Sequence, residues 1–225
     1  MPRDPDYQIG IINEKVESYL ASRAPKSDPV LFEIEKDAEK RSVPIIGPLV
    51  GRMISMILKS AKPEKALEVG TATGYSGIWI ARSLQGDKKK LTTIEVDPKM
   101  RESASNNFRK AGVDKYAEII SGDARRIVPE IVAKNKGLFD VVFLDVGDKT
   151  LYVDLLDSCV VALRAGGLLF ADNTLWGGAV ALSKDKTPET VTIRKFNELV
   201  YSDKRLDAAI IPLRDGVTIA YKKNP

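Results

Sequence analysis

Oxygen-bearing side chains follow two apolar runs of the sequence, at the point where each run ends. FDVVFL is followed by Asp145, and GGLLFA is followed by Asp172 and Asn173. Such runs predict buried strands, and a parallel sheet binds ligands beyond the carboxyl ends of its strands. One acid at a strand end is commonly a loop or helix cap, but two strands ending this way favour a shared site. These hard oxygen donors predict a divalent-metal site, with Mg²⁺ the first choice and Mn²⁺ or Ca²⁺ as alternatives.

A glycine-rich turn predicts a second binding feature beside this site. In LEVGTATGYS, at residues 67–76, an apolar run ends in Gly70, and Gly74 precedes a helical pattern. Glycine lets the backbone approach a ligand closely, and the helix that follows offers free N–H groups. Glu95 ends the next apolar run, LTTIEV, where a parallel sheet holds the two hydroxyls of a ribose. The sequence therefore predicts a nucleoside-containing cofactor.

The composition excludes several kinds of chemistry. The 225 residues include no histidine and one cysteine, Cys159, so a histidine base, a Cys/His zinc site and an internal disulfide are excluded. A lone cysteine among apolar neighbours is typical of a buried residue in a reducing cytoplasm. The net charge of +4 permits a nucleic-acid partner without requiring one. No apolar run approaches the ~20 residues of a membrane span, and the first ten residues are too polar for a signal peptide.

The elements that must position these residues alternate along the chain. We expect helices at residues 10–23, 30–41 and 48–60 before the sheet begins. The predicted strands are 65–69, 91–95, 117–121, 139–145 and 167–172, and the predicted helices among them are 75–84, 98–111, 125–134, 150–164 and 188–202. This alternation predicts a parallel sheet with helices on both faces. In the final stretch, AAIIPLRDGVTIAYK, an Asp-Gly pair between two apolar runs predicts an antiparallel hairpin.

The predicted fold class is therefore α/β, with a seven-stranded, mostly parallel sheet closed by an antiparallel C-terminal hairpin. This layout resembles the Rossmann-like class I methyltransferases. More specifically, the chain resembles the metal-dependent catechol and caffeoyl-CoA O-methyltransferases. The resemblance runs from the helix near Gly47 to the terminal hairpin, and its motifs are LEVGTATGYS, TTIEVD, GDARRIVPEI, FDVVFLD, ADNTLWGGAV and RDGVTIAYK. ADNTLWGGAV is the most discriminating of them, because dehydrogenases also use a glycine turn.

The resemblance implies S-adenosylmethionine as the methyl donor, a divalent metal, a phenolic or catechol-like acceptor and a homodimer. Residues 46–225 would form the methyltransferase domain, and residues 1–45 a helical cap that contributes substrate and dimer contacts. The implied cofactor contacts run from the methionine part to the adenine. They are Glu68, Gly70 and Thr71 at the methionine part, Ser76 at its carboxylate, Glu95 at the ribose hydroxyls, Asp123 and Ala124 beside the adenine, and Ile46 and Gly47 in a covering stretch.

The resemblance also implies roles around the acceptor. Asp145, Asp172 and Asn173 match the metal ligands, and Asp145 would also reach the amino group of the cofactor. Trp176 would form part of the acceptor pocket, unless it is a loop aromatic packed on the core. The loop at residues 176–187 is rich in glycine and lysine, and we expect it to be a mobile lid.

One lysine of the family motif stands at a different spacing in this chain. The family writes Asp-x-Asp-Lys, whereas this chain reads Asp145-Val146-Gly147-Asp148-Lys149, so its lysine comes one position later. A one-residue insertion accounts for the difference. Lys149 is the candidate for the residue that accepts the proton of the acceptor hydroxyl. The alternative is a lysine at a helix start that points into solvent.

Three other functions are compatible with parts of the pattern. The acceptor could be a hydroxylated uridine in tRNA, although no basic and aromatic stripe typical of RNA binding is visible. A nicotinamide-dependent oxidoreductase also needs a glycine turn and a ribose-binding acid, but the spacing here departs from G-x-G-x-x-G. A cofactor-binding protein without turnover is the third, because the lysine is displaced.

Overall fold

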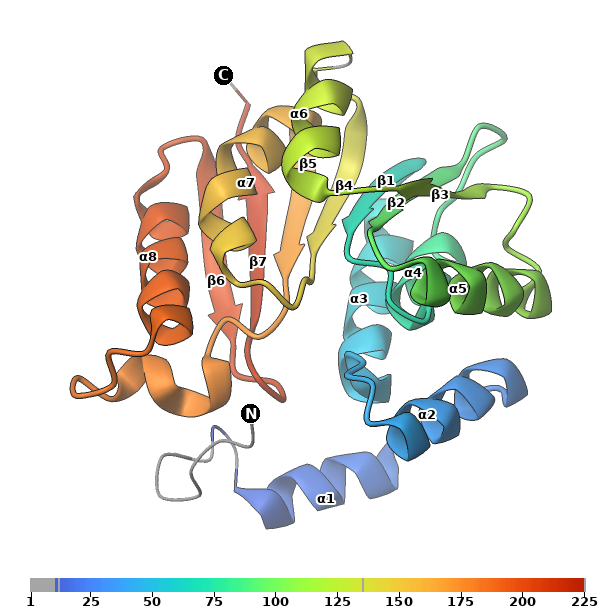
Figure 1. The fold of residues 1–225 in the computed structure, drawn as a ribbon, viewed down its shortest axis with the longest axis horizontal. Helices are drawn as coiled ribbons and strands as arrows, with labels where there is room; N and C mark the ends of the chain where they lie inside the picture. Colours follow the sequence, from blue (N-terminus) through green and yellow to red (C-terminus); the bar gives the residue numbers. More distant parts are fainter. Residues whose placement is uncertain (1–10, 12, 135, 225) are drawn as a thin grey trace.

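A seven-stranded sheet with the order β3-β2-β1-β4-β5-β7-β6 forms the centre of the protein (Figure 1). The computed structural model describes residues 11, 13–134 and 136–224. The strands are β1 (Lys65–Val69), β2 (Lys90–Glu95), β3 (Ala117–Ser121), β4 (Phe139–Leu144), β5 (Leu163–Ala171), β6 (Leu206–Ile211) and β7 (Val217–Lys222). β1 to β5 pair in parallel, and β7 pairs antiparallel with both β5 and β6. The predicted mixed sheet and its C-terminal hairpin are confirmed.

Helices cover both faces of this sheet. They are α1 (Glu14–Arg23), α2 (Pro29–Arg41), α3 (Gly47–Ala61), α4 (Tyr75–Ala81), α5 (Pro98–Ala111), α6 (Ala124–Lys134), α7 (Thr150–Ala162), the 3₁₀ helix η2 (Trp176–Ala181) and α8 (Pro188–Ser202). Several of them begin with proline, whose fixed φ suits the first turn, and Asp97 caps α5 with its side chain. Because the chain crosses from β3 back to β4 beside β1, the strand order reverses between β1 and β4. Ligands of such sheets bind at this point.

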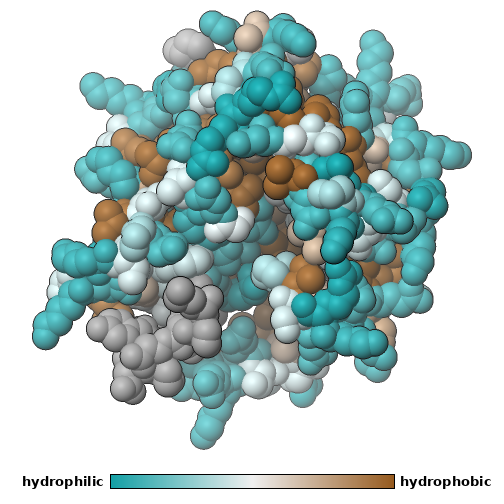
Figure 2. All heavy atoms as spheres, viewed as in Figure 1, coloured by the Kyte–Doolittle hydropathy of each residue, from teal (hydrophilic) through white to brown (hydrophobic). Residues whose placement is uncertain are grey.

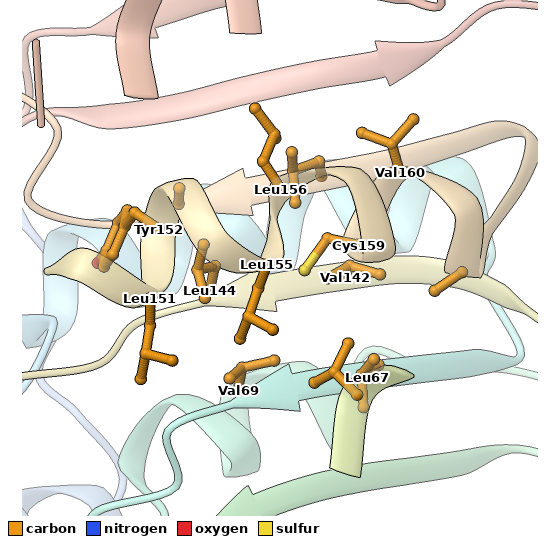
Figure 3. Packing of buried hydrophobic residues seen from close by; sticks show 14 of the residues in the cluster. Leu67, Val69, Val142, Leu144, Leu151, Tyr152, Leu155, Leu156, Cys159 and Val160 are labelled. Atoms are coloured by element: carbon orange, nitrogen blue, oxygen red, sulfur yellow. The ribbon is translucent and has the colours of Figure 1, made fainter. Parts of the chain in front are cut away.

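Two apolar clusters, one on each face, hold the helices to the sheet. Side chains alternate along each strand, so Val142 and Leu144 of β4 face one cluster and Val141 and Phe143 face the other. The first cluster lies under α6, α7 and α8, and Figure 3 shows side chains of α7 lying over those of β1 and β4. Cys159 belongs to this cluster and is fully buried, as predicted.

Some element boundaries differ from the sequence prediction for local reasons. The predicted helices 98–111 and 188–202 match α5 and α8, whereas α4 ends at Ala81 instead of residue 84. In the turn after α4, the backbone hydrogen bonds span three residues instead of four. They run from Ser83 N to Ile80 O and from Leu84 N to Ala81 O, and this tighter turn ends the helix. β5 begins at Leu163, not at residue 167, because Leu163 already pairs with Phe139. The predicted first helix includes residues 10 and 12, which lie outside the described residues.

The helices before the sheet differ in how they are anchored. α2 buries Leu31, Ile34 and Ala38 against the body of the protein, whereas no residue of α1 is buried. Hydrophilic residues cover most of the face seen in Figure 2, and apolar residues appear between them in small groups. In the described part of the chain, no helix combines the length and apolar character that crossing a membrane requires.

Candidate active site

The turns after β1 and β4 touch each other at the point where the strand order reverses. Gly70 has a φ of +98°, and a Cβ built there would lie 1.8 Å from the carbonyl oxygen of Asp145. Any other residue would therefore push the two turns apart. The backbone N–H of Asp145 donates to Val69 O at 2.9 Å, which fixes the second turn. Gly70, which we predicted to lie beside a cofactor, thus also sets the position of Asp145, a predicted metal ligand.

A cavity of about 320 Å³ opens beside this contact, at the carboxyl ends of β1 to β4. Five of the residues predicted to bind the cofactor line it: Gly70, Glu95, Asp123, Ala124 and Asp145. The structure thus brings together residues from four different strand ends. Their individual contacts with a cofactor stay predictions.

The Glu95 carboxylate is fixed at the rim of this cavity. Its two oxygens accept hydrogen bonds from the backbone N–H groups of Ala72, at 2.8 Å, and Asp97, at 2.9 Å. Ala72 lies in the glycine turn and has a φ of +43°. Each carboxylate oxygen can accept a further hydrogen bond, so the group is oriented for a ligand before the ligand arrives.

Other predicted cofactor residues lie behind the cavity wall. Glu68 is fully buried and accepts hydrogen bonds from Ser76 Oγ at 2.6 Å and from Thr93 Oγ1 at 2.7 Å. Burial raises the pKa of Glu68 to about 8, although these two hydrogen bonds oppose the shift. Thr71 Oγ1 lies 2.5 Å from Thr93 Oγ1, in the same network. The Ser76 hydroxyl is therefore engaged by Glu68 in this structure.

The predicted covering stretch precedes α3. Ile46 is almost fully buried, and Gly47 has a φ of +71° with open space around the position of a Cβ. Gly47 is followed by Pro48, near the first turn of α3. Ile46 therefore serves the core of the protein in this structure, and the role of both residues at the cofactor stays a prediction.

Asp145, which is partly buried, and Asp172, which is buried, are neighbouring acids beyond β4 and β5. Burial raises the pKa of Asp172 to about 7, and the neighbouring Asp145 raises it further, while Arg214 lowers it. Burial also raises the pKa of Asp145, against the lowering effect of Lys149 and Arg214. Arg214 Nη1 donates to Asp172 Oδ2 at 3.0 Å, whereas Asp172 Oδ1 is buried without a hydrogen-bond partner among the described residues.

This chemistry fits a divalent cation. A buried carboxylate oxygen without a partner is costly, and so is a pair of neighbouring like charges, and a bound cation would relieve both. Within the described residues, no three or more Asp, Glu, Cys or His side chains form a group that could hold a metal ion. The predicted set therefore depends on the amide oxygen of Asn173 as its third donor.

Lys149 points into this site, although the chain carries an extra residue before it. Its side chain is buried, and Nζ donates to Asn173 Oδ1 at 3.1 Å, to Val146 O at 2.9 Å and to Tyr152 Oη at 3.1 Å. Nζ also lies 5.4 Å from the centre of the Trp176 ring. The alternative of a lysine pointing into solvent is therefore wrong. Whether Lys149 accepts a proton stays a prediction.

The loop that carries Trp176 is fastened to the protein. Trp176 is partly buried and packs against the first apolar cluster, so it contacts both the core and the candidate site. Arg194 of α8 donates to the carbonyl oxygens of Ala179, Val180, Leu182 and Asp185. We expected a mobile lid from composition, but composition does not reveal a partly buried guanidinium that donates to four carbonyls.

Three further residues of the site were missed by sequence reasoning. Tyr152 Oη donates to Asp172 O at 2.8 Å, and Asp215 accepts hydrogen bonds from Asn173 and from the backbone N–H of Gly177. Arg214, already described, is the third. The signal for Arg214 and Asp215 was present in RDG, but we interpreted it as a hairpin turn and a motif of the resemblance, and assigned neither residue a role at the site.

Comparisons with known proteins agree with this geometry. An O-methyltransferase family model matches residues 22–223. The chain is 34% identical over 217 residues to a caffeoyl-CoA O-methyltransferase from Stellaria longipes, covering 92% of this chain and 89% of that protein. It is 30% identical to a catechol O-methyltransferase from Niastella koreensis, covering 94% and 98%. The crystal structure of the O-methyltransferase TomG from Streptomyces achromogenes, in complex with SAM, superposes with a TM-score of 0.83 at 27% identity, covering 93% and 96%.

The fold is that of Rossmann-like enzymes, and a cavity lies where its strand order reverses. The chain belongs to the O-methyltransferase family, and it is an S-adenosylmethionine-dependent methyltransferase. The family assignment sets aside the nicotinamide-dependent oxidoreductase.

Proposed function

We propose that this enzyme uses a divalent metal, with Mg²⁺ the first choice, to methylate a hydroxyl of a catechol-like small molecule. The observation that carries the proposal is the unpartnered, buried Oδ1 of Asp172 beside Asp145. Asp145, Asp172 and Asn173 are the residues that would hold the metal. Once bound there, a divalent cation would chelate two vicinal oxygens of the acceptor and lower the pKa of the attacking hydroxyl.

The remaining side chains orient the acceptor and move its proton. In its neutral amine form, Lys149 Nζ would accept the proton of the acceptor hydroxyl, and Asn173 Oδ1 and Val146 O, at 3.1 and 2.9 Å, would stabilise the ammonium that results. Trp176 forms one wall of the acceptor pocket. Because methyl transfer from a sulfonium requires mainly in-line alignment, these fixed positions supply much of the catalysis.

We propose the following contacts for S-adenosylmethionine, supported by the cavity beside Gly70. Glu68, Gly70 and Thr71 lie nearest its methionine part. Ser76 binds the carboxylate once its hydroxyl turns from Glu68, Asp145 reaches the amino group and Glu95 holds the ribose hydroxyls. Asp123 and Ala124 flank the adenine, and Ile46 and Gly47 cover the cofactor.

A methyl-transfer screen tests this function. Catechols, caffeoyl esters and tRNA are each incubated with labelled S-adenosylmethionine, with and without Mg²⁺. We expect turnover on a catechol or caffeoyl ester that EDTA abolishes and Mg²⁺ restores. Turnover that survives thorough chelation would remove the metal from the mechanism, and methylation of tRNA alone would replace the acceptor. Asp172→Ala should lose turnover while it still binds cofactor, because Glu95 and the glycine turn remain.

We also propose that the protein is a cytoplasmic homodimer and that residues 1–45 serve as its cap and contact segment. The apolar side chains Val16, Tyr19 and Leu20 of α1 are exposed, which supports a contact there. Light scattering after size exclusion should give a dimer mass that Tyr19→Lys reduces to that of a monomer. A monomeric wild type would contradict this arrangement. The single buried thiol, Cys159, supports a reducing compartment.

A further inference from the structure

The turn between β6 and β7 is bound to the segment that carries two of the proposed metal ligands. The backbone N–H of Thr174 donates to Gly216 O at 3.0 Å, and that of Leu175 donates to Asp215 O at 2.9 Å. A Cβ at Gly216 would lie 2.4 Å from Leu175 Cγ, so only glycine permits this close approach. The residues just before Gly216 are thereby held beside Asp172 and Asn173.

Asp215 determines which way the Asn173 amide faces. Asn173 Nδ2 donates to Asp215 Oδ2 at 3.1 Å, and Asn173 Oδ1 accepts from Lys149 Nζ at 3.1 Å. The reversed amide would set its oxygen against a carboxylate and its NH₂ group against an ammonium. Both contacts therefore favour the same orientation, in which the amide oxygen lies on the side of Lys149.

Arg214 determines in the same way which oxygen of Asp172 is free. Its guanidinium donates to Oδ2 at 3.0 Å, and this bond leaves Oδ1 as the oxygen without a partner among the described residues. Asp172 is almost fully buried, so no solvent competes for the bond, whereas about a third of the Arg214 side chain is exposed. The ion pair thus holds one oxygen and presents the other.

The backbone around these contacts is held in an uncommon conformation. Asn173 and Arg214 have φ values of +59° and +53°. Residues other than glycine seldom adopt such angles, and they persist where surrounding contacts over-determine them. Here the contacts that hold the two residues are those that join the turn to the end of β5.

We propose that Arg214 and Asp215 are positioning residues that orient the two proposed metal ligands directly after β5. Arg214 orients the Asp172 carboxylate, and Asp215 orients the Asn173 amide. The second oxygen of Asp215 accepts from Gly177 N, so the same carboxylate also fixes the backbone beside Trp176. The inference rests on the proposed metal dependence. Removing a partner that orients a metal ligand typically weakens metal binding by about 10- to 100-fold.

Asp215→Asn tests the first half of this inference. The variant keeps the shape of the side chain but has only one acceptor oxygen, and its NH₂ group meets either Asn173 Nδ2 or Gly177 N. We expect the Mn²⁺ dissociation constant, measured by electron paramagnetic resonance, to rise about 10- to 100-fold. Asp207→Asn, the same change at an exposed position on β6, is the matched control and should bind Mn²⁺ like the wild type. S-adenosylhomocysteine affinity should stay unchanged in both variants, which separates lost positioning from a lost fold.

Arg214→Gln tests the second half of this inference, the orienting role of Arg214. The direction of the change in Mn²⁺ affinity decides between this role and a purely electrostatic effect. Loss of a positive charge beside the site would by itself tighten cation binding. Loss of the contact that orients Asp172 would have the opposite effect, so weaker Mn²⁺ binding identifies the orienting role. We expect the dissociation constant to rise about tenfold, with Arg214→Lys recovering part of the loss. Tighter binding in Arg214→Gln, or unchanged binding in Asp215→Asn, would overturn the role of that residue and leave the proposed function standing. A wild-type protein that binds no Mn²⁺ at millimolar concentration would instead overturn the metal dependence itself.

Discussion

Glu68→Gln should change how the stability of the fold depends on pH. Burial raises the pKa of the Glu68 carboxyl from 4.5 to about 8 in the folded protein. The folded state therefore binds the proton more tightly than the unfolded state does. The contribution of Glu68 to stability is fully present below pH 4.5, and it is lost as the pH rises to about 8.

The size of the effect follows from that difference. One pKa unit corresponds to about 1.4 kcal/mol, so the interval from 4.5 to about 8 corresponds to about 5 kcal/mol. That is comparable to the lower end of the total stability of a natural domain, about 5 to 15 kcal/mol. The glutamine carries no charge to bury. Its two hydroxyl partners, Ser76 and Thr93, can each donate or accept, so the hydrogen bonds survive.

Urea unfolding followed by circular dichroism, repeated from pH 4.5 to 8.5 without divalent cations, measures this. The unfolding free energy of Glu68→Gln minus that of the wild type should grow with pH, by up to about 5 kcal/mol. Asp172 titrates in both proteins and cancels in the difference, and Asp145, whose charge raises the pKa of Glu68 further, enters the difference only through that coupling. Glu118→Gln, on β3 of the same sheet with a half-exposed side chain, should shift stability by no more than an exposed ion pair, about 1 kcal/mol. A difference that stays constant with pH would refute the argument that Glu68 is held protonated by burial.

Three further variants address the site and its loop. Glu95→Gln should weaken S-adenosylhomocysteine binding about tenfold in calorimetry, because a neutral amide replaces a charged acceptor; unchanged affinity would exclude a ribose contact. Lys149→Met should slow single-turnover methyl transfer about 10²- to 10⁴-fold at unchanged cofactor affinity, and an undiminished rate would assign the proton to another acceptor. Arg194→Gln should accelerate amide hydrogen exchange across residues 179–185, since its guanidinium donates to Ala179 O and Asp185 O; wild-type exchange rates would show that other contacts fix this loop.

The positions of the strand ends followed from local sequence, and so did the grouping of the site residues. Short segments in which apolar residues predominate define β1 and β4, and the residue that follows such a segment must lie at the edge of the sheet. Because parallel strands end at the same edge, Gly70 and Asp145 could be placed together without knowing the strand order. The order itself was not predicted. Nothing local in the hairpin indicates that β7, and not β6, pairs with β5.

The contacts of Arg214 and Asp215 could not be predicted from local sequence either, because they depend on the same unpredicted strand order. Each bonds a residue 42 positions earlier in the chain, and that meeting exists only because β7 lies beside β5. A turn motif read alone gives the chain reversal but not the partner on which the turn packs. Sequence reasoning therefore identified the proposed ligands but missed the residues that aim them.

Lys149 illustrates why spacing along the chain is a weaker guide than helix position. The extra residue separates Lys149 from Asp145, yet Lys149 directly precedes α7, and α7 is fixed by Tyr152, whose hydroxyl donates to Asp172 O. Space remains around Gly147, where a Cβ would meet nothing within 4 Å, so the loop before the helix has room for the added residue. Asp148 turns outward to pair with Arg125, at 2.8 Å, while Lys149 turns inward. The lysine is placed by the packing of the helix that follows it, and an insertion upstream of that helix therefore lengthens the loop without withdrawing the amine from the site.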